Sequence, residues 1–294
     1  MSKQQIRQII EKRVPRPGIV DTDTEGVRLF RVTEPVPCSP AVYEPTVVAI
    51  VSGSKEAVLD GKRHVYDSSA YFCCPISLPV LAGTPTASPE DPLLGVIIAL
   101  NRRVMTEIAI EIENTIGPVR HPEHCLPGVA LSKWDTSFTD ALLRLLELGG
   151  DAAATAVLSE GRLRELYFAV LKGEAGHAAR NAFGVGNEIA RTIQFLSANL
   201  NAPVSIDDMA AHAGMSRAVF HRKFKQATTM SPIQFAKSMR LNKAAMKIAG
   251  GRSVSEAAWE VGYVSASQFS REFKRLYGQT PKQWGQETQL SIGV

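Results

Sequence analysis

Two short stretches near the C-terminal end place basic side chains between paired aromatic ones. The first, FHRKFK, runs from Phe220 to Lys225, and the second, FSREFK, runs from Phe269 to Lys274. Guanidinium and ammonium groups bind phosphate oxygens, and arginine can also donate two hydrogen bonds to one guanine base. The chain therefore has the residue types that bind nucleic acid at two separate places.

The sequence around these stretches is also repeated. Phe224 lies 49 residues before Phe273, and Pro232 lies 49 residues before Pro281. Upstream of the aromatic residues the spacing is 48, which indicates one inserted residue in the second copy. The pairs with the shorter spacing are Ala210 with Ala258 and Gly214 with Gly262.

Each copy has the spacing of a helix-turn-helix. Because alanine adds little bulk, it would let two helices approach closely, and the glycine four residues later would adopt the left-handed conformation that ends the first helix. Phenylalanines spaced i, i+4 would anchor the second helix on its domain. Ser205 and Asp208 have the spacing of a capping box at the start of the first copy.

A long helix is predicted between the copies, from Pro232 to Ala249. At 1.5 Å per residue it would be about 27 Å long. A rigid helix of this length would hold the two second helices near one turn of DNA apart, about 34 Å, so that they face successive major grooves.

Charge is distributed unevenly along the chain. From Asn187 onward there are 14 Lys and Arg and 7 Asp and Glu, a net charge of +7, whereas the preceding residues carry −3. A basic C-terminal third is typical of nucleic-acid-binding modules, although many basic domains bind no polyanion.

Proline content separates the N-terminal part from the rest. Fourteen of the 17 prolines lie before residue 130, between short β-branched runs, so we predict strands there and helices after it. About six short antiparallel strands, with Asp60-Gly61 as a hairpin turn, suggest a sandwich or barrel. The expected strands cover 47–53, 55–66, 71–73, 78–81 and 93–100, the expected helices cover 102–116, 132–150 and 157–171, and a Gly/Ala-rich link covers 173–187.

At its repeated residues the chain resembles the AraC/XylS family of bacterial transcription regulators. Arg240-Leu241 followed by Ala244 is similar to the linker helix of that family, whereas Trp259 and Trp284-Gly285 depart from its pattern. The matching C-terminal pattern consists of Ala258, Gly262, Tyr263, Ser267, Phe269, Ser270, Arg271, Phe273, Lys274, Gly278, Thr280 and Pro281.

This resemblance implies which side chains would contact DNA. Phe220 and Phe224 face the core of the first copy, so the basic residues beside them lie on or near the open face. The implied DNA-binding residues are Arg217, Ala218, His221, Arg222 and Lys225 in the first copy, and Ala266, Ser267, Ser270, Arg271, Lys274 and Arg275 in the second. The alternative is that they form a solvated charged surface, which is the ordinary role of such residues.

The N-terminal part resembles the cupin-like sensor domain of one branch of the same family. The similarity covers roughly residues 25 to 175, and it includes the YEP triplet and the Leu78-Pro79-Val80 step; Cys73-Cys74 stand where small aliphatic residues are more usual. Such a barrel can enclose a small molecule. The candidate effector-binding residues are Tyr43, Glu44, His64 and Tyr66, each of which could instead be structural.

Catalytic and metal chemistry have little support in the sequence. A cupin enzyme would need several metal-binding histidines on paired strands, but this segment offers His64 alone. The HPEHC stretch from His121 to Cys125 has ligand types at close spacing, but it lacks a second cluster, so an ordinary loop is expected. We expect Cys73 and Cys74 to be buried small hydrophobic residues rather than oxidant sensors, and we predict no metal, cofactor or catalytic residue.

The sequence thus predicts an α+β protein: a cupin-like (jelly-roll) barrel with following helices over residues 1–183, and an all-α module of two helix-turn-helix units joined by a linker helix over residues 187–290. The expected partners are double-stranded promoter DNA and RNA polymerase, with a small-molecule effector and a homodimer left open. The charged N-terminal residues lack an apolar signal core and no apolar run is long enough to span a bilayer, so a cytoplasmic protein without membrane contact is expected.

Two other functions stay open from the sequence. One is a cupin-type enzyme or a repair protein with a DNA-binding tail, although such repair chemistry uses a zinc-bound cysteine cluster that these four cysteines do not form. The other is a protein that uses the helices at 132–171 only for association, which would leave the basic repeat without a role.

Overall fold

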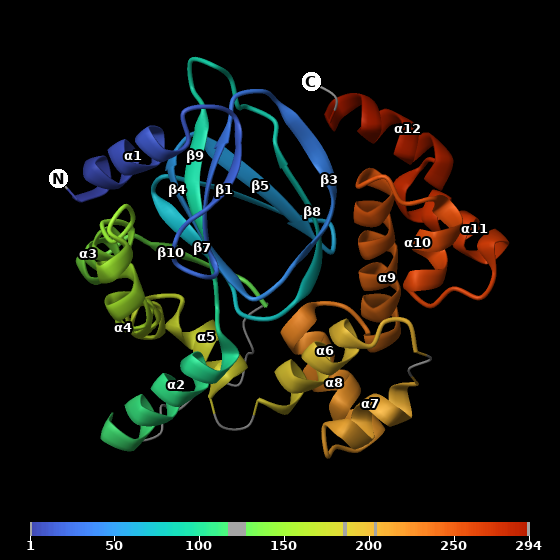
Figure 1. The fold of residues 1–294 in the computed structure, drawn as a ribbon. Helices are drawn as coiled ribbons and strands as arrows, with labels where there is room; N and C mark the ends of the chain where they lie inside the picture. The colour runs from blue at the N-terminus through green and yellow to red at the C-terminus, as the bar shows by residue number, and fades with distance from the viewer. Residues whose placement is uncertain (1, 117–127, 185–186, 203–204, 293–294) are drawn as a thin grey trace.

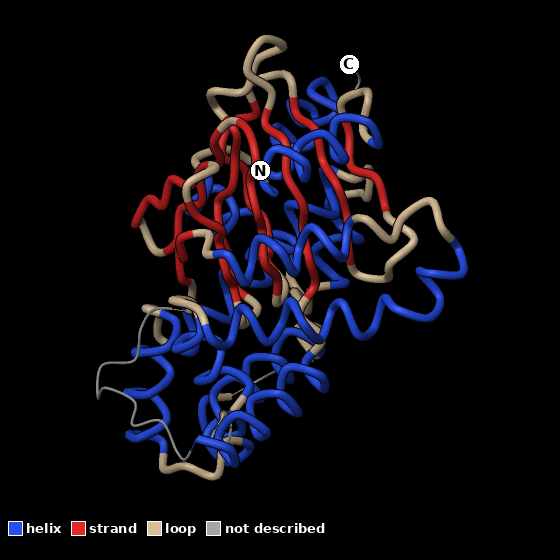
Figure 2. Tube along the Cα trace, turned by 90° about the vertical axis from the view of Figure 1, so that its left-hand side faces the viewer, coloured by secondary structure: helices blue, strands red, loops and turns tan. Residues whose placement is uncertain are grey.

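The computed structural model describes residues 2–116, 128–184, 187–202 and 205–292. Figure 1 shows a β barrel with helices beside it, and a cluster of helices on its other side. Figure 2, seen from the side, shows the strands running together through the upper part of the molecule, with most helices below and around them.

Within the described residues, ten strands pair in antiparallel fashion to form two sheets. The six-stranded sheet has the order β1-β2-β9-β4-β7-β10, and the four-stranded sheet has the order β3-β8-β5-β6. This arrangement confirms the β-rich N-terminal part predicted from the sequence. The strands are β1 Gly18–Asp21, β2 Val27–Val32, β3 Val36–Tyr43, β4 Thr46–Ser52, β5 Ser54–Leu59, β6 Lys62–Asp67, β7 Ala70–Cys74, β8 Leu78–Thr84, β9 Leu93–Ala99 and β10 Ala130–Lys133.

The central strands of the six-stranded sheet are apolar because they are covered on both faces. Every residue of β4 is buried, and Val47 pairs with Ile98 of β9 on one side and with Cys73 of β7 on the other. At the edge of the second sheet, Asp60 and Gly61 take positive φ values of 46° and 77°. The hairpin turn between β5 and β6 is therefore as predicted.

Helices pack around the barrel on the side of the six-stranded sheet. Ile6 and Ile10 of α1 are fully buried, and α1 contacts β4 and β9. α2 packs on α4 and α5, and α3 packs on α4. These helices are α1 Ser2–Arg13, α2 Arg102–Ile116, α3 Thr136–Leu146, α4 Ala152–Lys172 and α5 Gly176–Phe183.

The remaining described residues form seven helices, here called the C-terminal helical module. The long helix α9 lies against strands β3 and β8 of the four-stranded sheet (Figure 1). Its Asn242 is 4% exposed and donates hydrogen bonds to the carbonyls of Ala41, at 2.7 Å, and Val80, at 2.9 Å. The helices are α6 Glu188–Ala198, α7 Ile206–His212, α8 Arg217–Thr228, α9 Pro232–Ala249, α10 Val254–Glu260, α11 Ala266–Tyr277 and α12 Pro281–Ile292.

The structure differs from the expected secondary structure in the number of strands, in the helix over 132–150 and in the link over 173–187. There are more strands than the six predicted, because β1, β2, β3 and β10 are short or carry mixed residues that show no clear alternation. The helix expected over 132–150 spans only Thr136–Leu146, since Ala130–Lys133 pairs with β7 as an edge strand. The expected link holds helix α5, whose small residues Ala178, Ala179 and Ala182 are buried on one face, so alanine content outweighs the flanking glycines.

Candidate nucleic-acid interface

The first copy of the repeat is a helix-turn-helix made of α7 and α8. Ser205 caps α7 through the backbone N–H of Asp208, and the Asp208 carboxylate accepts from the Ser205 N–H in return, so the predicted capping box is present. Gly214 takes a φ of +63° in the turn, in the left-handed region that favours glycine. Ser216 then caps α8 through the N–H of Val219.

The second copy, α10 and α11, has the same construction. Ser253 and Glu256 form a capping box at α10, and Ser265 caps α11. Gly262 takes a φ of +87°, and a Cβ there would lie 2.7 Å from the carbonyl oxygen of Leu200. The second turn therefore needs glycine for its backbone conformation and also for its close approach to the end of α6.

Paired phenylalanines anchor both second helices, as predicted. Phe220 and Phe224 of α8 are fully buried, and Phe224 contacts Phe235 of α9 edge-on at a centroid distance of 5.2 Å. Phe269 and Phe273 of α11 are also fully buried, with centroids 5.5 Å apart. Because these side chains fix one face of each helix against the core, the opposite face is turned to solvent.

Most of the residues predicted to contact DNA lie on those open faces. Ten of the eleven are exposed, and Ser270 is half-buried. Arg217 is 3.7 Å from Asp207 of the preceding helix, in an exposed ion pair that a phosphate could replace. Arg275 lines a groove between the module and the barrel, so its position differs from that of the other basic residues. Contact with DNA stays a prediction for all eleven.

The acidic residue of α11 is turned away from this surface. Glu272 is 3.0 Å from the ammonium of Lys237 on α9, and it accepts a hydrogen bond from the hydroxyl of Tyr263 at 2.8 Å. The negative charge between Arg271 and Lys274 is thus neutralised by groups on the inner side. This leaves the open face of α11 with positive charge.

The linker helix is joined to the first unit by Arg240. Its guanidinium donates to the carbonyls of Leu200 and Ala202, both at 2.8 Å, so it satisfies backbone groups just after α6. Lys243, one turn further, donates to the carbonyl of Ser197 at 3.1 Å. These contacts hold α9 in a defined position relative to α6.

The four candidate effector residues do not form one cluster. Tyr43 and Tyr66 face each other inside the barrel, with hydroxyls 3.4 Å apart and Phe72 against both rings. Burial raises the pKa of both phenols, so they stay neutral hydrogen-bonding groups. Glu44 instead lies at the end of the barrel, where its carboxylate accepts from Ser77 at 2.5 Å. His64 is half-buried on β6, and burial followed by the charge of Lys62 lowers its pKa.

Sequence reasoning missed the polar contacts between barrel and module. Asn242, besides its two bonds to strand carbonyls, accepts a hydrogen bond from the hydroxyl of Tyr277 in α11. Its helical spacing from the buried Phe235 and Met239, seven and three residues earlier, is the one signal in α9 that could have indicated a buried role. Its partners lie on strands about 160 and 200 positions earlier, and no spacing in the sequence points to them.

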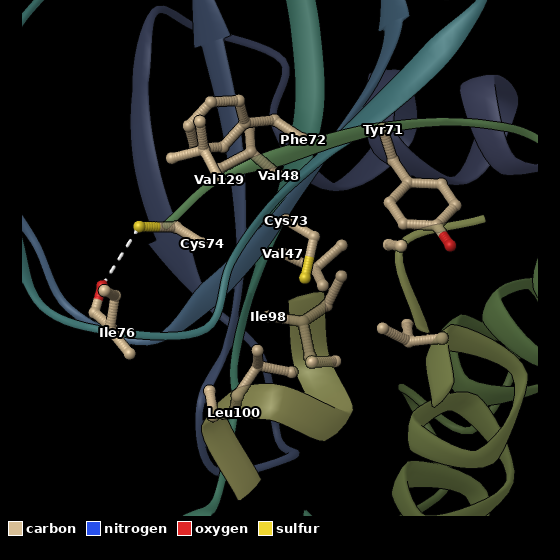
Figure 3. Close-up of a cluster of buried hydrophobic side chains, with 14 of the residues drawn as sticks. Val47, Val48, Tyr71, Phe72, Cys73, Cys74, Ile76, Ile98, Leu100 and Val129 are labelled. Atoms are coloured by element: carbon tan, nitrogen blue, oxygen red, sulfur yellow. Dashed lines mark hydrogen bonds between the residues drawn. The ribbon is translucent and has the colours of Figure 1, made fainter. Parts of the chain in front are cut away.

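The adjacent cysteines are structural. Figure 3 shows the Cys73 sulfur beside Val47 and Ile98, and the Cys74 Sγ donating to the carbonyl of Ile76, at 3.1 Å. Burial raises the pKa of Cys73 to about 12 and that of Cys74 well above its usual value, so neither is a thiolate at neutral pH. The structure thus supports the prediction that they are buried small hydrophobic residues.

Within the described ranges, no group of three or more His, Cys, Asp or Glu side chains could hold a metal ion. The stretch from His121 to Cys125 lies outside the described residues. No described helix combines the length and the apolar character required to cross a bilayer.

Comparison with known proteins gives two family matches. Residues 23–178 match the family described as "AraC-type transcriptional regulator N-terminus", and residues 209–287 match the "Helix-turn-helix domain" family. The first match alone covers more than half of the chain.

Similar curated proteins match about a third of the chain. The chain is 40% identical over 84 residues to the HTH-type transcriptional regulator MtrA of Neisseria gonorrhoeae, a match over 28% of each chain. It is 29% identical over 97 residues to the regulatory protein SoxS of Salmonella typhimurium, covering 33% of this chain and 91% of SoxS. The chain therefore spans less than a third of the length of MtrA, the first of these relatives.

Among solved structures, most of the chain is similar in fold to ToxT of Vibrio cholerae. A crystal structure of an apo ToxT variant superimposes with a TM-score of 0.57 and 12% sequence identity, over 88% of this chain and 96% of that one. At this identity the likeness concerns the fold: a barrel and a double helix-turn-helix module in one chain.

Proposed function

The chain belongs to the family of AraC-type transcriptional regulators, and we propose that it regulates transcription by binding promoter DNA through both helix-turn-helix units. The observation that carries this proposal is the pair of equivalent helices, α8 and α11. Each is anchored by two buried phenylalanines and presents exposed basic residues, and α9 joins the two units. Residues 187–290 form the DNA-binding domain in this proposal, and residues 1–183 form the sensor domain.

The proposed contacts divide into two kinds. Arg222 and Arg271, with Ala218, Ser267 and their neighbours, would approach base edges, where arginine selects guanine and small side chains contact thymine methyl groups. Arg217, Lys225, Lys274 and Arg275 would bind phosphates, which sets position and affinity but not sequence preference.

A DNA-binding measurement tests the proposal. Sites bound by the full chain would first be mapped on genomic DNA, and the affinity for one site would then be measured by fluorescence anisotropy over a range of salt concentrations. We expect the affinity to fall steeply with salt, because bound phosphates release counterions. A DNA carrying only half of the site should bind much more weakly. A flat salt dependence, or equal affinity for half and full sites, would refute binding through two units.

We further propose that a small-molecule effector acts on the sensor domain. The supporting observation is that the chain shares its fold with ToxT, of which one structure is described as bound to unsaturated fatty acid and another to a naphthalenyl-butenoic acid. An effector can change transcription only if it binds one arrangement of the two parts better than another. The contacts of α9 with β3 and β8 are where such a difference would be transmitted.

The same proposal includes the cellular location, the partners and the absence of catalysis. The protein would act without catalysis in the cytoplasm, with RNA polymerase as a partner at the promoter and without membrane contact. Association as a homodimer would be measured by analytical ultracentrifugation with and without DNA.

A further inference from the structure

One residue of the second helix-turn-helix unit has no counterpart in the first. The serines that cap the second helices, Ser216 and Ser265, correspond to each other, and so do the residues that follow the turn glycines, Met215 and Tyr263. Met215 is followed directly by the capping serine, whereas Val264 stands between Tyr263 and Ser265. Val264 is therefore the residue inserted in the second copy.

The side chain of Val264 is turned out of the protein. It is 92% exposed, whereas Met215 in the first turn is half-buried against the core. An apolar residue just before a helix cap often packs on the fourth residue of the helix, which is Phe269 in α11. Phe269 is fully buried, but the exposure of Val264 leaves it outside such a contact. Packing within the described structure thus does not account for an apolar side chain at this position.

Both neighbours of Val264 are tied to the protein. On one side, the ring of Tyr263 contacts the ring of Phe269, with centroids 5.2 Å apart, and its hydroxyl donates to a carboxylate of α11. On the other side, the Ser265 Oγ accepts a hydrogen bond from the N–H of Gln268 at 3.2 Å. Because the backbone is fixed at both ends of this turn, Val264 would lose little conformational freedom when it contacts a partner.

Val264 lies at the end of α11 that would approach the bases. In helix-turn-helix proteins the N-terminal residues of the second helix contact base edges in the major groove. Val264 is two positions before Ala266, the first residue of α11. The barrel lies near the other end of this helix. The residues of α11 that line the groove beside the barrel are all in its C-terminal half: Glu272, Arg275, Leu276 and Tyr277.

Val264 and Ala266 give this end of the second unit an apolar surface. Both are exposed, and neither side chain can form a hydrogen bond. The first unit differs, because α8 begins with the exposed Arg217, which pairs with Asp207 at 3.7 Å. The apolar group that a base presents in the major groove is the 5-methyl group of thymine. Contact between this methyl group and an isopropyl side chain would remove both from water, whereas cytosine has no methyl group there.

We propose that Val264 selects thymine in the half-site bound by the second unit, through contact of its side chain with the 5-methyl group. This inference rests on the proposed function and adds a base preference that belongs to the second unit alone. The inserted residue would therefore make the two half-sites differ in sequence, although the two units are built alike.

Deoxyuridine substitution tests the proposal, because it removes only the methyl group of thymine. Each thymine of one mapped DNA site would be replaced in turn, and the affinity of the full chain would be measured by fluorescence anisotropy. We expect one position at which the replacement weakens wild-type binding by about fourfold, which corresponds to the burial of one methyl group. The same replacement should leave the affinity of Val264→Ala unchanged.

Val264→Ala should also bind the unmodified site about fourfold more weakly than the wild-type protein, since the same contact is lost. Its melting temperature should equal that of the wild type, because the side chain is exposed. Val65→Ala is the matched control, since Val65 is 51% exposed on β6, outside the DNA-binding module. It should respond to every deoxyuridine replacement as the wild type does.

The proposal is overturned if no deoxyuridine position separates the wild type from Val264→Ala, or if the two bind the unmodified site equally. It is also overturned if Val264→Ala weakens binding to unrelated DNA by the same factor, which would indicate contact with the DNA backbone. These outcomes leave the proposed function intact as long as the wild-type protein binds its site through both units. If the wild-type protein binds no DNA, the proposed function itself fails.

Discussion

Gly214 and Gly262 occupy equivalent turns, but their surroundings differ. A Cβ on Gly214 would meet nothing within 4 Å, whereas a Cβ on Gly262 would lie 2.7 Å from the Leu200 carbonyl oxygen and 2.9 Å from that of Asn201. Both residues have positive φ, so alanine is strained at either position. The sequence repeat makes the two glycines look identical, and only their neighbours distinguish them.

Gly262→Ala should therefore destabilise the protein more than Gly214→Ala. At residue 214 we expect the free energy of unfolding to fall by about 1–2 kcal/mol, because alanine is strained in the left-handed backbone conformation. At residue 262 the new Cβ would also press on backbone that cannot move aside. This contact should lower the free energy of unfolding by about a further 1–3 kcal/mol. Urea denaturation of the two variants measures the difference, and equal losses would show that the approach to α6 is not tight in solution.

Arg271 is the residue whose exposure and position most favour base recognition in α11. Arg271→Ala should weaken specific DNA binding by about 1–3 kcal/mol and relax the preference at one or two base pairs. Arg103→Ala removes the same charge from α2, outside the module, and should leave the affinity almost unchanged. Fluorescence anisotropy on wild-type and singly substituted sites is the measurement, and an equal effect of both variants would indicate a purely electrostatic role.

At the scale of elements, the ends of α8 and α11 show how the two copies diverged. Both helices end in a left-handed residue, which is Gly278 in α11, at φ +78°, and Thr229 in α8, at φ +66°. A β-branched residue is strained in this conformation, whereas glycine is not. The alignment of the repeat predicts the helix end, but it does not show that threonine adopts the glycine conformation.

Thr229→Gly should raise the free energy of unfolding by about 1 kcal/mol, since relief of left-handed strain exceeds the added flexibility of the unfolded chain. The reciprocal change, Gly278→Thr, should lower it by at least as much. Thermal unfolding of both variants checks the pair. A lower melting temperature for Thr229→Gly would mean that the Thr229 hydroxyl, which donates to the Thr228 carbonyl at 2.6 Å, contributes more than the strain costs.

Elements with strong local signals were predicted well, and the others were not. α2 and α9 have the predicted bounds, because periodic apolar residues and an N-terminal cap or proline define them locally. β10 and α5 were misassigned since their structure depends on partners elsewhere: β10 completes a sheet edge, and α5 buries alanines against neighbouring helices.

At the scale of the whole molecule, the two helix-turn-helix units are packed differently. The buried residues of the first unit belong to the large cluster that also contains the barrel core, whereas those of the second form a separate cluster with the C-terminal half of α9. Asn242 lies between them, bonded to the barrel strands and to Tyr277. The second unit is therefore connected to the barrel mainly through α9, on which α10 and α12 pack.

Asn242→Ala should loosen the second unit from the barrel. The substitution leaves two strand carbonyls and the Tyr277 hydroxyl without this hydrogen-bond partner. Because these groups are buried, the free energy of unfolding should fall by about 1–3 kcal/mol. We expect faster amide hydrogen exchange in α9 and α11, with the exchange of β4 and β9 unchanged. Gln234→Ala, an exposed change on the same helix, is the control; identical exchange in both variants would show that Asn242 does not hold the two parts together.

The sequence by itself determined the double helix-turn-helix, its basic character and the strand-rich part before it, because capping residues, helical periodicity, turn glycines and charge are local properties of the chain. It also indicated which side chains lie on the open faces of α8 and α11, since the buried phenylalanines orient each helix. The tertiary structure decided what these segments build together: the two sheets and the contact of α9 with the barrel. Those features join residues up to about 200 positions apart, and their energies come from packing and desolvation that no local pattern records.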